Sequence, residues 1–163
     1  MANDIARVAA WLQPKEILLD IEVPDREQAL HVAATAIARS NALDPAPIYR
    51  ALLRREQAHS TALGDGFAVP HARIAGIATS TTVYMRTSHG LAFHAPDGKP
   101  VTDLLAIMVP PDGANDDHLK LLALVARLFS DRGFRKQLHQ SPDVDTAART
   151  FRQSISELKA SPR

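Results

Sequence analysis

Three polar side chains stand out because of their positions along the chain. His71 directly follows the proline that ends a short apolar run, Arg55 lies on the apolar stripe of an expected helix, and His118 lies in the first turn of another. An imidazole can act as a nucleophile and carry a phosphoryl group. A guanidinium offers a planar fork of donors that matches phosphate oxygens. If the three side chains converge, the chemistry that they favour is phosphoryl transfer.

Each of these residues also has a purely structural interpretation. A lone histidine is commonly a satisfied structural group, and an arginine in the last turn of a helix commonly complements the helix dipole. His118 could equally be a simple cap-region residue. We interpret the remaining histidines as solvated: His31, His59, His89, His94 and His139. No two histidines form a helical i, i+4 pair and no His-Glu-x-x-His pattern occurs, so we predict no metal and no cofactor.

The elements that must position these residues can be read from local patterns. Asp25 followed by Gln28 has the form of a capping box, and a helical apolar stripe follows it. Asp44 and Pro45 indicate the start of a second helix, whose inward stripe ends at Arg55. The first stripe consists of Leu30, Ala33, Ala34 and Ile37, and the second of Ile48, Ala51, Leu52 and Arg55.

Short apolar runs separated by glycine and proline predict strands at residues 67–69, 81–87 and 104–109. The last of these is a continuous apolar run, as in a central strand buried on both faces. A third helix is expected to start near Asn115, and Ser141-Pro142 predicts the cap of a last helix. Strands and helices on one core indicate an α/β single domain, with a strand order that the pattern leaves open.

The amino-acid composition argues against several classes of function. The chain has 163 residues, of which 45% are hydrophobic and 23% are charged, with a formal net charge of +1, so nucleic acid is not an expected partner. The absence of cysteine excludes disulfides and thiolate chemistry. The N-terminus lacks the pattern of a signal peptide, and the most apolar stretch, residues 119–129, contains two cations. We therefore expect a cytoplasmic protein without membrane insertion.

Residues 55–71 read REQAHSTALGDGFAVPH. This segment resembles the phosphorylation-site region of type-2 enzyme IIA domains of the bacterial phosphotransferase system, the fructose, mannitol and nitrogen-regulatory branch. The family pattern is Arg-Glu, a short gap, Ser-Thr-Gly-Ile/Leu-Gly, one residue, then Gly-Ile/Val-Ala-Ile/Val-Pro-His. Residues 100–110 resemble the family's central strand, and residues 117–128 resemble the helix that carries its second histidine.

The resemblance implies a role for each residue that matches the motif. His71 matches the phospho-accepting histidine, phosphorylated on Nε2, His118 the second active-site histidine, and Arg55 the arginine beside the phosphoryl group. The implied fold is a mixed β-sheet with helices packed on both sides. The implied donor is an HPr-type phosphocarrier protein or its nitrogen-branch counterpart. Two positions depart from the pattern: Ala62 replaces a glycine and Phe67 a smaller aliphatic residue.

Together these observations predict a type-2 enzyme IIA domain at residues 15–153, between an N-terminal segment, 1–14, and a C-terminal tail, 154–163. We expect a phosphohistidine carrier of the regulatory, nitrogen type, since no IIB or membrane IIC segment is joined to it. Two alternatives stay open. One is a fructose- or mannitol-type protein that passes the phosphoryl group to a IIB domain for sugar uptake. The other is an interaction module that kept the fold without phosphorylation.

Overall fold

The computed structural model describes residues 13–111 and 115–160, with the backbone alone for residues 115–118, 120, 121, 159 and 160. The chain divides into two compact units. One unit is the continuous segment Leu18–Pro111. The other combines Met1–Ile17 with Asp112–Arg163. Each unit is described by itself.

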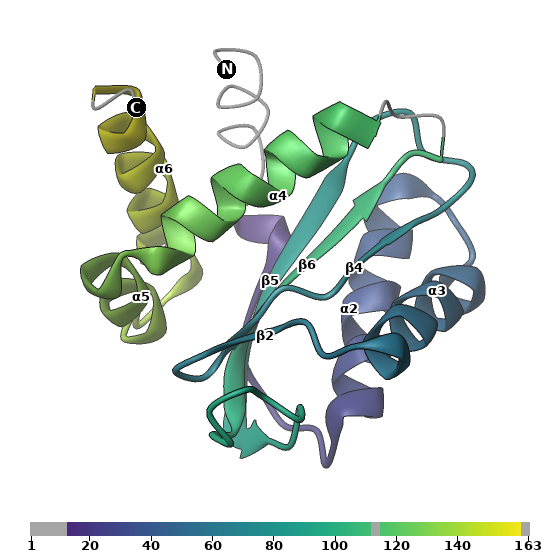
Figure 1. The fold of residues 1–163 in the computed structure, drawn as a ribbon, viewed down its shortest axis with the longest axis horizontal. Coiled ribbons are helices and arrows are strands. Elements are labelled where there is room, and N and C mark those ends of the chain that lie inside the picture. Colours follow the sequence, from purple (N-terminus) through teal and green to yellow (C-terminus); the bar gives the residue numbers. More distant parts are fainter. Residues whose placement is uncertain (1–12, 112–114, 161–163) are drawn as a thin grey trace. The chain divides into compact units, whose positions relative to one another are not determined.

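The segment Leu18–Pro111 is organised around a six-stranded sheet with the order β1-β5-β6-β3-β2, in which β4 also pairs with β6 (Figure 1). Its strands are β1 (Ile17–Ile21), β2 (Ala62–Gly64), β3 (Phe67–Ala68), β4 (His71–Arg73), β5 (Thr81–Leu91) and β6 (Val101–Val109). β5 is antiparallel to β6, whereas β3 and β4 are parallel to it. The sheet is therefore mixed, and the prediction of an α/β fold with a mixed sheet is confirmed.

Strand β6 is the common partner of the strands around the candidate site. The apolar run predicted at residues 104–109 forms most of it, and all six of these residues are buried. Along one edge it pairs with β5, and along the other it pairs first with β3 and then with β4. A strand that is paired on both edges and buried on both faces needs an uninterrupted apolar sequence, which explains the pattern.

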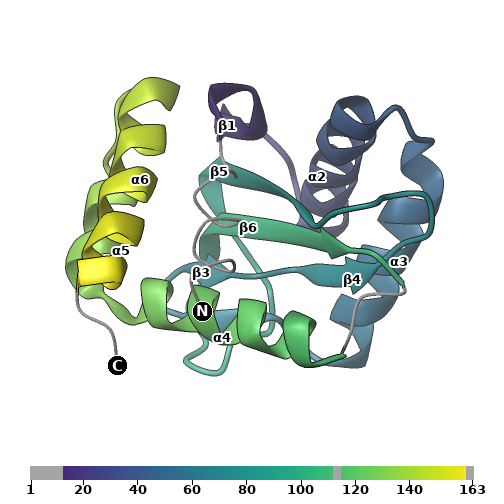
Figure 2. The same ribbon diagram turned by 90° about the horizontal axis from the view of Figure 1, so that it is seen from above.

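Two helices cover one face of this sheet: α2 (Arg26–Asn41) and α3 (Pro45–Ala58) (Figure 2). Both begin where the sequence predicts, since Asp25 accepts a hydrogen bond from Gln28 N at 2.8 Å and Asp44 accepts one from Ala46 N at 3.0 Å. Their apolar stripes pack on Val83 of β5 and on the alternate residues Ala106 and Met108 of β6. The shared core contains Leu30, Ala33, Ala34, Ile37, Ala38, Ile48, Leu52, Val83, Ala106 and Met108.

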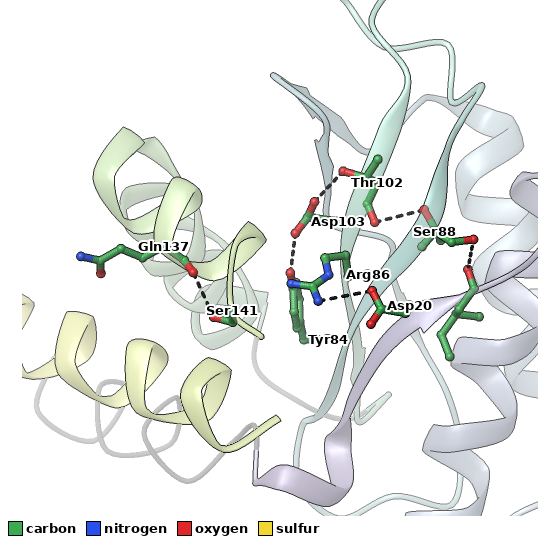
Figure 3. Close-up of polar contacts among 10 residues, drawn as sticks. Asp20, Tyr84, Arg86, Ser88, Thr102, Asp103, Gln137 and Ser141 are labelled. Carbon is green, nitrogen blue, oxygen red and sulfur yellow. Dashed lines mark hydrogen bonds and ion pairs between the residues drawn. The ribbon is translucent and has the colours of Figure 1, made fainter. Parts of the chain in front are cut away.

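Between β5 and β6, a buried polar network interrupts the apolar packing (Figure 3). The Tyr84 hydroxyl donates to the Asp103 carboxylate, which also accepts from Thr102 Oγ1 at 2.6 Å. Burial raises the pKa of Tyr84, and the adjacent Asp103 charge raises it further. Arg86 lies opposite Asp103 in the register and pairs with Asp20 at 3.4 Å. The phenol therefore stays protonated and serves as a donor to the buried carboxylate.

The described residues of the second unit form a short 3₁₀ turn, η1 (Pro14–Glu16), and three helices, α4 (Asn115–Ser130), α5 (Arg132–His139) and α6 (Val144–Ala160). Phe129, Phe134 and Phe151 provide one ring from each helix. The three rings meet edge to face with centroid separations of 5.2–6.1 Å. Such contacts favour a fixed arrangement of the three helices.

The start of α6 differs from the prediction. The predicted cap was Ser141, but the side chain that caps the helix is Asp143, which accepts from Thr146 N at 2.7 Å. Ser141 is buried, and its hydroxyl donates instead to Gln137 O at the end of α5. The helix also continues past residue 153, because Ile155 is buried on the same stripe as Phe151.

Candidate functional site

His71 is held in place by main-chain pairing. It is the first residue of β4, opposite Ile107 in the parallel register with β6. Just before it, Pro70 O accepts a hydrogen bond from Ile107 N at 2.8 Å. Proline cannot donate to the ladder, so Pro70 separates β3 from β4 while its carbonyl still anchors the chain. The short strand predicted at residues 67–69 is confirmed as β3, but His71 begins a further strand that was not predicted.

The side chain of His71 is half-buried and makes a specific hydrogen bond. Its Nδ1 lies 2.8 Å from Val69 O. A carbonyl oxygen only accepts, so Nδ1 carries the hydrogen and donates it. In the neutral ring, the lone pair is then on Nε2. If His71 acts as a nucleophile, this geometry selects Nε2 as the atom that attacks.

The surroundings of His71 favour the neutral ring. Burial is the largest influence and lowers the pKa of His71 below its ordinary value. The hydrogen bond to Val69 O acts in the opposite direction. Arg55 also lowers this pKa, and Glu56 raises it. The net effect keeps the ring unprotonated, which is the form that can attack phosphorus.

Arg55 lies in the last turn of α3, half-buried on the predicted stripe. Its Nη1 donates to His59 O, at the helix C-cap, over 2.6 Å. The structural interpretation of this residue therefore holds, because the guanidinium satisfies a terminal carbonyl. Its electrostatic effect on His71 shows that the same charge also acts on the imidazole.

His118 lies in the first turn of α4, which starts at Asn115 as the sequence predicts. Its side chain is outside the described part of the structure, so its convergence with His71 and Arg55 stays a prediction. The other histidines, His31, His59, His89, His94 and His139, are exposed. Among the side chains that the structure describes, no three metal-binding residues lie together.

Sequence reasoning missed two buried residues beside the site. Glu56, which follows Arg55, is 2% exposed and accepts hydrogen bonds from Thr61 N at 3.1 Å and from the Thr61 hydroxyl. Thr61 is itself buried. A signal was present: Glu56 lies four residues after Leu52, on the buried stripe of an amphipathic helix, where a carboxylate is unusual.

The two departures from the resembling motif are accommodated. Ala62 lies in β2 without a left-handed backbone and is buried in a core cluster with Ala68 and Leu104, so its Cβ has a place. Phe67 is buried in β3. The left-handed turn between these strands is formed by Gly64, Asp65 and Gly66. Glycine is needed in that turn and not at position 62.

No helix in the described residues is long and apolar enough to span a membrane.

The sequence and the fold both match known proteins. Residues 10–154 match the family described as "Phosphoenolpyruvate-dependent sugar phosphotransferase system, EIIA 2". The chain is 35% identical over 131 residues to a nitrogen regulatory protein of Bradyrhizobium diazoefficiens, which covers 80% of this chain and 85% of that protein. It is 29% identical over 140 residues to a fructose-specific EIIABC component of Bacillus subtilis, which covers 85% of this chain but 22% of that protein.

Solved structures show the same fold. The nitrogen regulatory protein IIA-Ntr of Neisseria meningitidis superposes with a TM-score of 0.82 at 32% identity, over 88% of this chain and 98% of that one. The mannitol IIA of Escherichia coli superposes with a TM-score of 0.72 at 20% identity, over 86% of this chain and 98% of that one. With a family match over residues 10–154 and these shared folds, the chain belongs to the type-2 enzyme IIA family of the phosphoenolpyruvate-dependent phosphotransferase system.

Proposed function

We propose that this protein accepts a phosphoryl group on Nε2 of His71 from an HPr-type phosphocarrier protein and acts in the cytoplasm as a regulatory, nitrogen-type enzyme IIA. The observation that carries the proposal is the hydrogen bond from Nδ1 of His71 to Val69 O. It places the lone pair of the neutral ring on Nε2 and helps to hold the orientation of the ring.

The chemistry is an exchange between two histidines. The Nε2 lone pair of His71 attacks phosphorus, the N–P bond to the donor histidine breaks, and the donor ring recovers its electron pair. The proton on Nδ1 stays in place, held by Val69 O. Phosphoryl transfer depends mainly on positioning and on charge stabilisation. Arg55 would offset negative charge on the phosphoryl oxygens, and His118 would hydrogen-bond the transferred group.

The regulatory role is supported by the nitrogen regulatory relatives. Besides that of Bradyrhizobium, one of Pseudomonas aeruginosa is 29% identical over 140 residues, covering 85% of this chain and 90% of that protein. The second candidate is transfer to a IIB domain for sugar uptake. It is favoured by the fructose-specific relative. A solved complex of the mannitol IIA with phosphorylated IIB shares the fold, with a TM-score of 0.72 at 18% identity.

Intact mass spectrometry after incubation with phosphoenolpyruvate, enzyme I and an HPr-type carrier tests the phosphorylation. We expect one added phosphoryl group, labile in acid and stable in base, as phosphoramidates are. His71→Ala should abolish it. His89→Ala is a matched control, because the side chain of His89 is exposed. Full labelling of His71→Ala would refute the assignment, and an unlabelled wild type would favour the interaction module.

The two physiological roles separate in a second assay. Phosphorylated protein is incubated with a IIB domain and, separately, with candidate regulatory partners. Transfer to IIB at a rate comparable with the uptake of the phosphoryl group would support sugar transport. Binding of a partner that changes with the state of His71, without transfer to IIB, would support regulation.

A further inference from the structure

We propose that Glu56 is a positioning residue for His71: its buried carboxylate anchors the loop whose carbonyl orients the imidazole. The inference rests on the proposed function of His71 as the phosphoryl acceptor. It assigns a role to a residue that touches neither the ring nor, by our proposal, the transferred group.

The anchoring starts at Thr61. Within the described residues, the hydrogen bonds of the Glu56 carboxylate all come from this one residue: Thr61 N lies 3.1 Å from Oε1 and 3.3 Å from Oε2, and the Thr61 hydroxyl donates to Oε2. Both side chains are buried, at 2% and 6% exposure. Hydrogen bonds to a charged acceptor are stronger than neutral ones, so this pair fixes the chain directly before β2.

From Thr61 the connection continues through the main chain. Val69 N donates to Thr61 O over 3.0 Å, and Val69 O accepts from Nδ1 of His71 at 2.8 Å. Glu56, Thr61, Val69 and His71 thus form an unbroken series of hydrogen bonds. The carbonyl that selects the tautomer of His71 is Val69 O, and its position depends on these hydrogen bonds.

The charge of Glu56 also suits the reaction. When Nε2 bonds to phosphorus while Nδ1 keeps its hydrogen, the ring gains positive charge. A fixed carboxylate near the ring stabilises that charge, as an orienting acid does for an imidazolium in other enzymes. The effects of the two neighbours on His71 are opposite in sign: Arg55 lowers its pKa and Glu56 raises it. Adjacent residues of α3 therefore act on the His71 ring with opposite charges.

Fold stability alone gives a poor account of this residue. A carboxylate in the last turn of a helix faces the negative end of the helix dipole, and its burial removes it from water. An apolar residue at this point of the stripe would avoid both penalties. A buried charge that destabilises the fold in these two ways is characteristic of a residue in a functional site.

The experiment compares Glu56→Gln with wild type and with Glu22→Gln, which removes the same charge at an exposed position. One measurement is the rate of phosphoryl uptake from the HPr-type carrier. The other is the NMR titration and ring tautomer of His71, which needs no phosphoryl donor. We expect Glu56→Gln to slow uptake on the order of tenfold, as for partners that orient a reacting group without touching the substrate, to lower the pKa of His71 and to populate the second tautomer. Glu22→Gln should match wild type.

A second pair of variants covers the case in which Glu56→Gln does not fold. Thr61→Val removes the hydroxyl that donates to Glu56, whereas Thr61→Ser keeps it. The valine variant should shift the same two readouts and the serine variant should restore them. Unchanged uptake and an unchanged His71 titration in folded Glu56→Gln, or in Thr61→Val if that variant alone folds, would overturn the proposal. If wild type takes up no phosphoryl group, the proposed function fails, and the NMR titration still decides whether Glu56 positions the ring.

Discussion

At the scale of single residues, the main chain orients the imidazole of His71. The Nδ1 hydrogen bond of His71 goes to the carbonyl of Val69, two residues earlier. Because the acceptor is a backbone atom, replacing the Val69 side chain cannot remove it. The local path of the chain thus contributes directly to the orientation of the ring.

The titration of His71 should reflect its burial. Its pKa is lowered, so the ring stays neutral in a range of pH, below about 6.5, where an ordinary histidine is mostly protonated. Phosphoryl uptake should therefore persist below pH 6.5. NMR titration of the His71 ring, alongside the pH dependence of uptake, checks this. A titration midpoint at or above the ordinary value would contradict it.

The same shift affects stability. In that range the unfolded chain binds a proton at His71 that the folded protein does not. The free energy of unfolding should consequently fall as the pH drops from about 6.5 towards the folded pKa. A His71→Asn variant should show a shallower fall in denaturant titrations over this window.

The structural role of Arg55 and its proposed role in phosphoryl transfer can be separated by a pair of variants. Arg55→Lys keeps a cation at the C-terminus of α3 but lacks the planar fork. It should retain most of the fold stability and still transfer slowly, whereas Arg55→Ala should lose on the order of 100-fold in rate. His118→Ala should likewise fold and transfer slowly. Thermal unfolding and uptake rates, measured together, check these outcomes, and wild-type rates in all three variants would leave only structural roles.

At the scale of elements, the sequence predicted the helix starts and the strand that are determined by residues a few positions apart. The starts of α2, α3 and α4 and the strand at residues 104–109 are confirmed, since caps and apolar periodicity act within a few residues. Strands β1, β2 and β4 were not predicted. They have three to five residues each, too few for a clear alternating pattern. β1 and β4 also depend on pairing with strands that come later in the chain, β5 and β6, which no short window records.

The same distinction applies to the site. Arg55 and His71 were identified from a stripe and a motif, and in the structure the Arg55 charge lies close enough to lower the pKa of His71. Glu56 was overlooked because its partner Thr61 lies beyond the end of the helix, where the helical pattern stops. A carboxylate on a buried stripe is the signal that could have found it.

The cap of α2 offers a test at this scale. Asp25 accepts from Gln28 N at 2.8 Å at the helix N-terminus. Asp25→Ala should lower the free energy of unfolding by about 1 kcal/mol, and Asp25→Asn should cost only a few tenths. Chemical denaturation checks both variants. Equal losses for the two variants would show that the cap hydrogen bond is not the source of the effect.

At the scale of the whole molecule, phosphorylation should change binding without changing the fold. A phosphoryl group adds about two negative charges at His71, next to the cation of Arg55, so the fold has no reason to rearrange. A partner that covers His71 with an apolar or acidic surface should be repelled. His71→Glu should reproduce this only in part, because it lacks the phosphoryl geometry.

Binding of the physiological partner to unmodified, phosphorylated and His71→Glu protein checks this, with circular dichroism on all three. Superimposable spectra are expected, together with a graded loss of affinity. Equal affinities across the set would exclude a phosphorylation-dependent regulator at this surface and leave sugar transport as the better account.

The double pairing of β6 also has a consequence for how the molecule folds. β5 and β6 are antiparallel neighbours joined by the connection at residues 92–100, so they can pair early. β3 and β4 are parallel to β6 and can join it only after the chain has closed a longer loop through all of β5. We expect pairings of this kind to form late. Competence to accept a phosphoryl group would then appear only in the final stage of folding, and a partly folded chain would carry His71 without being able to use it.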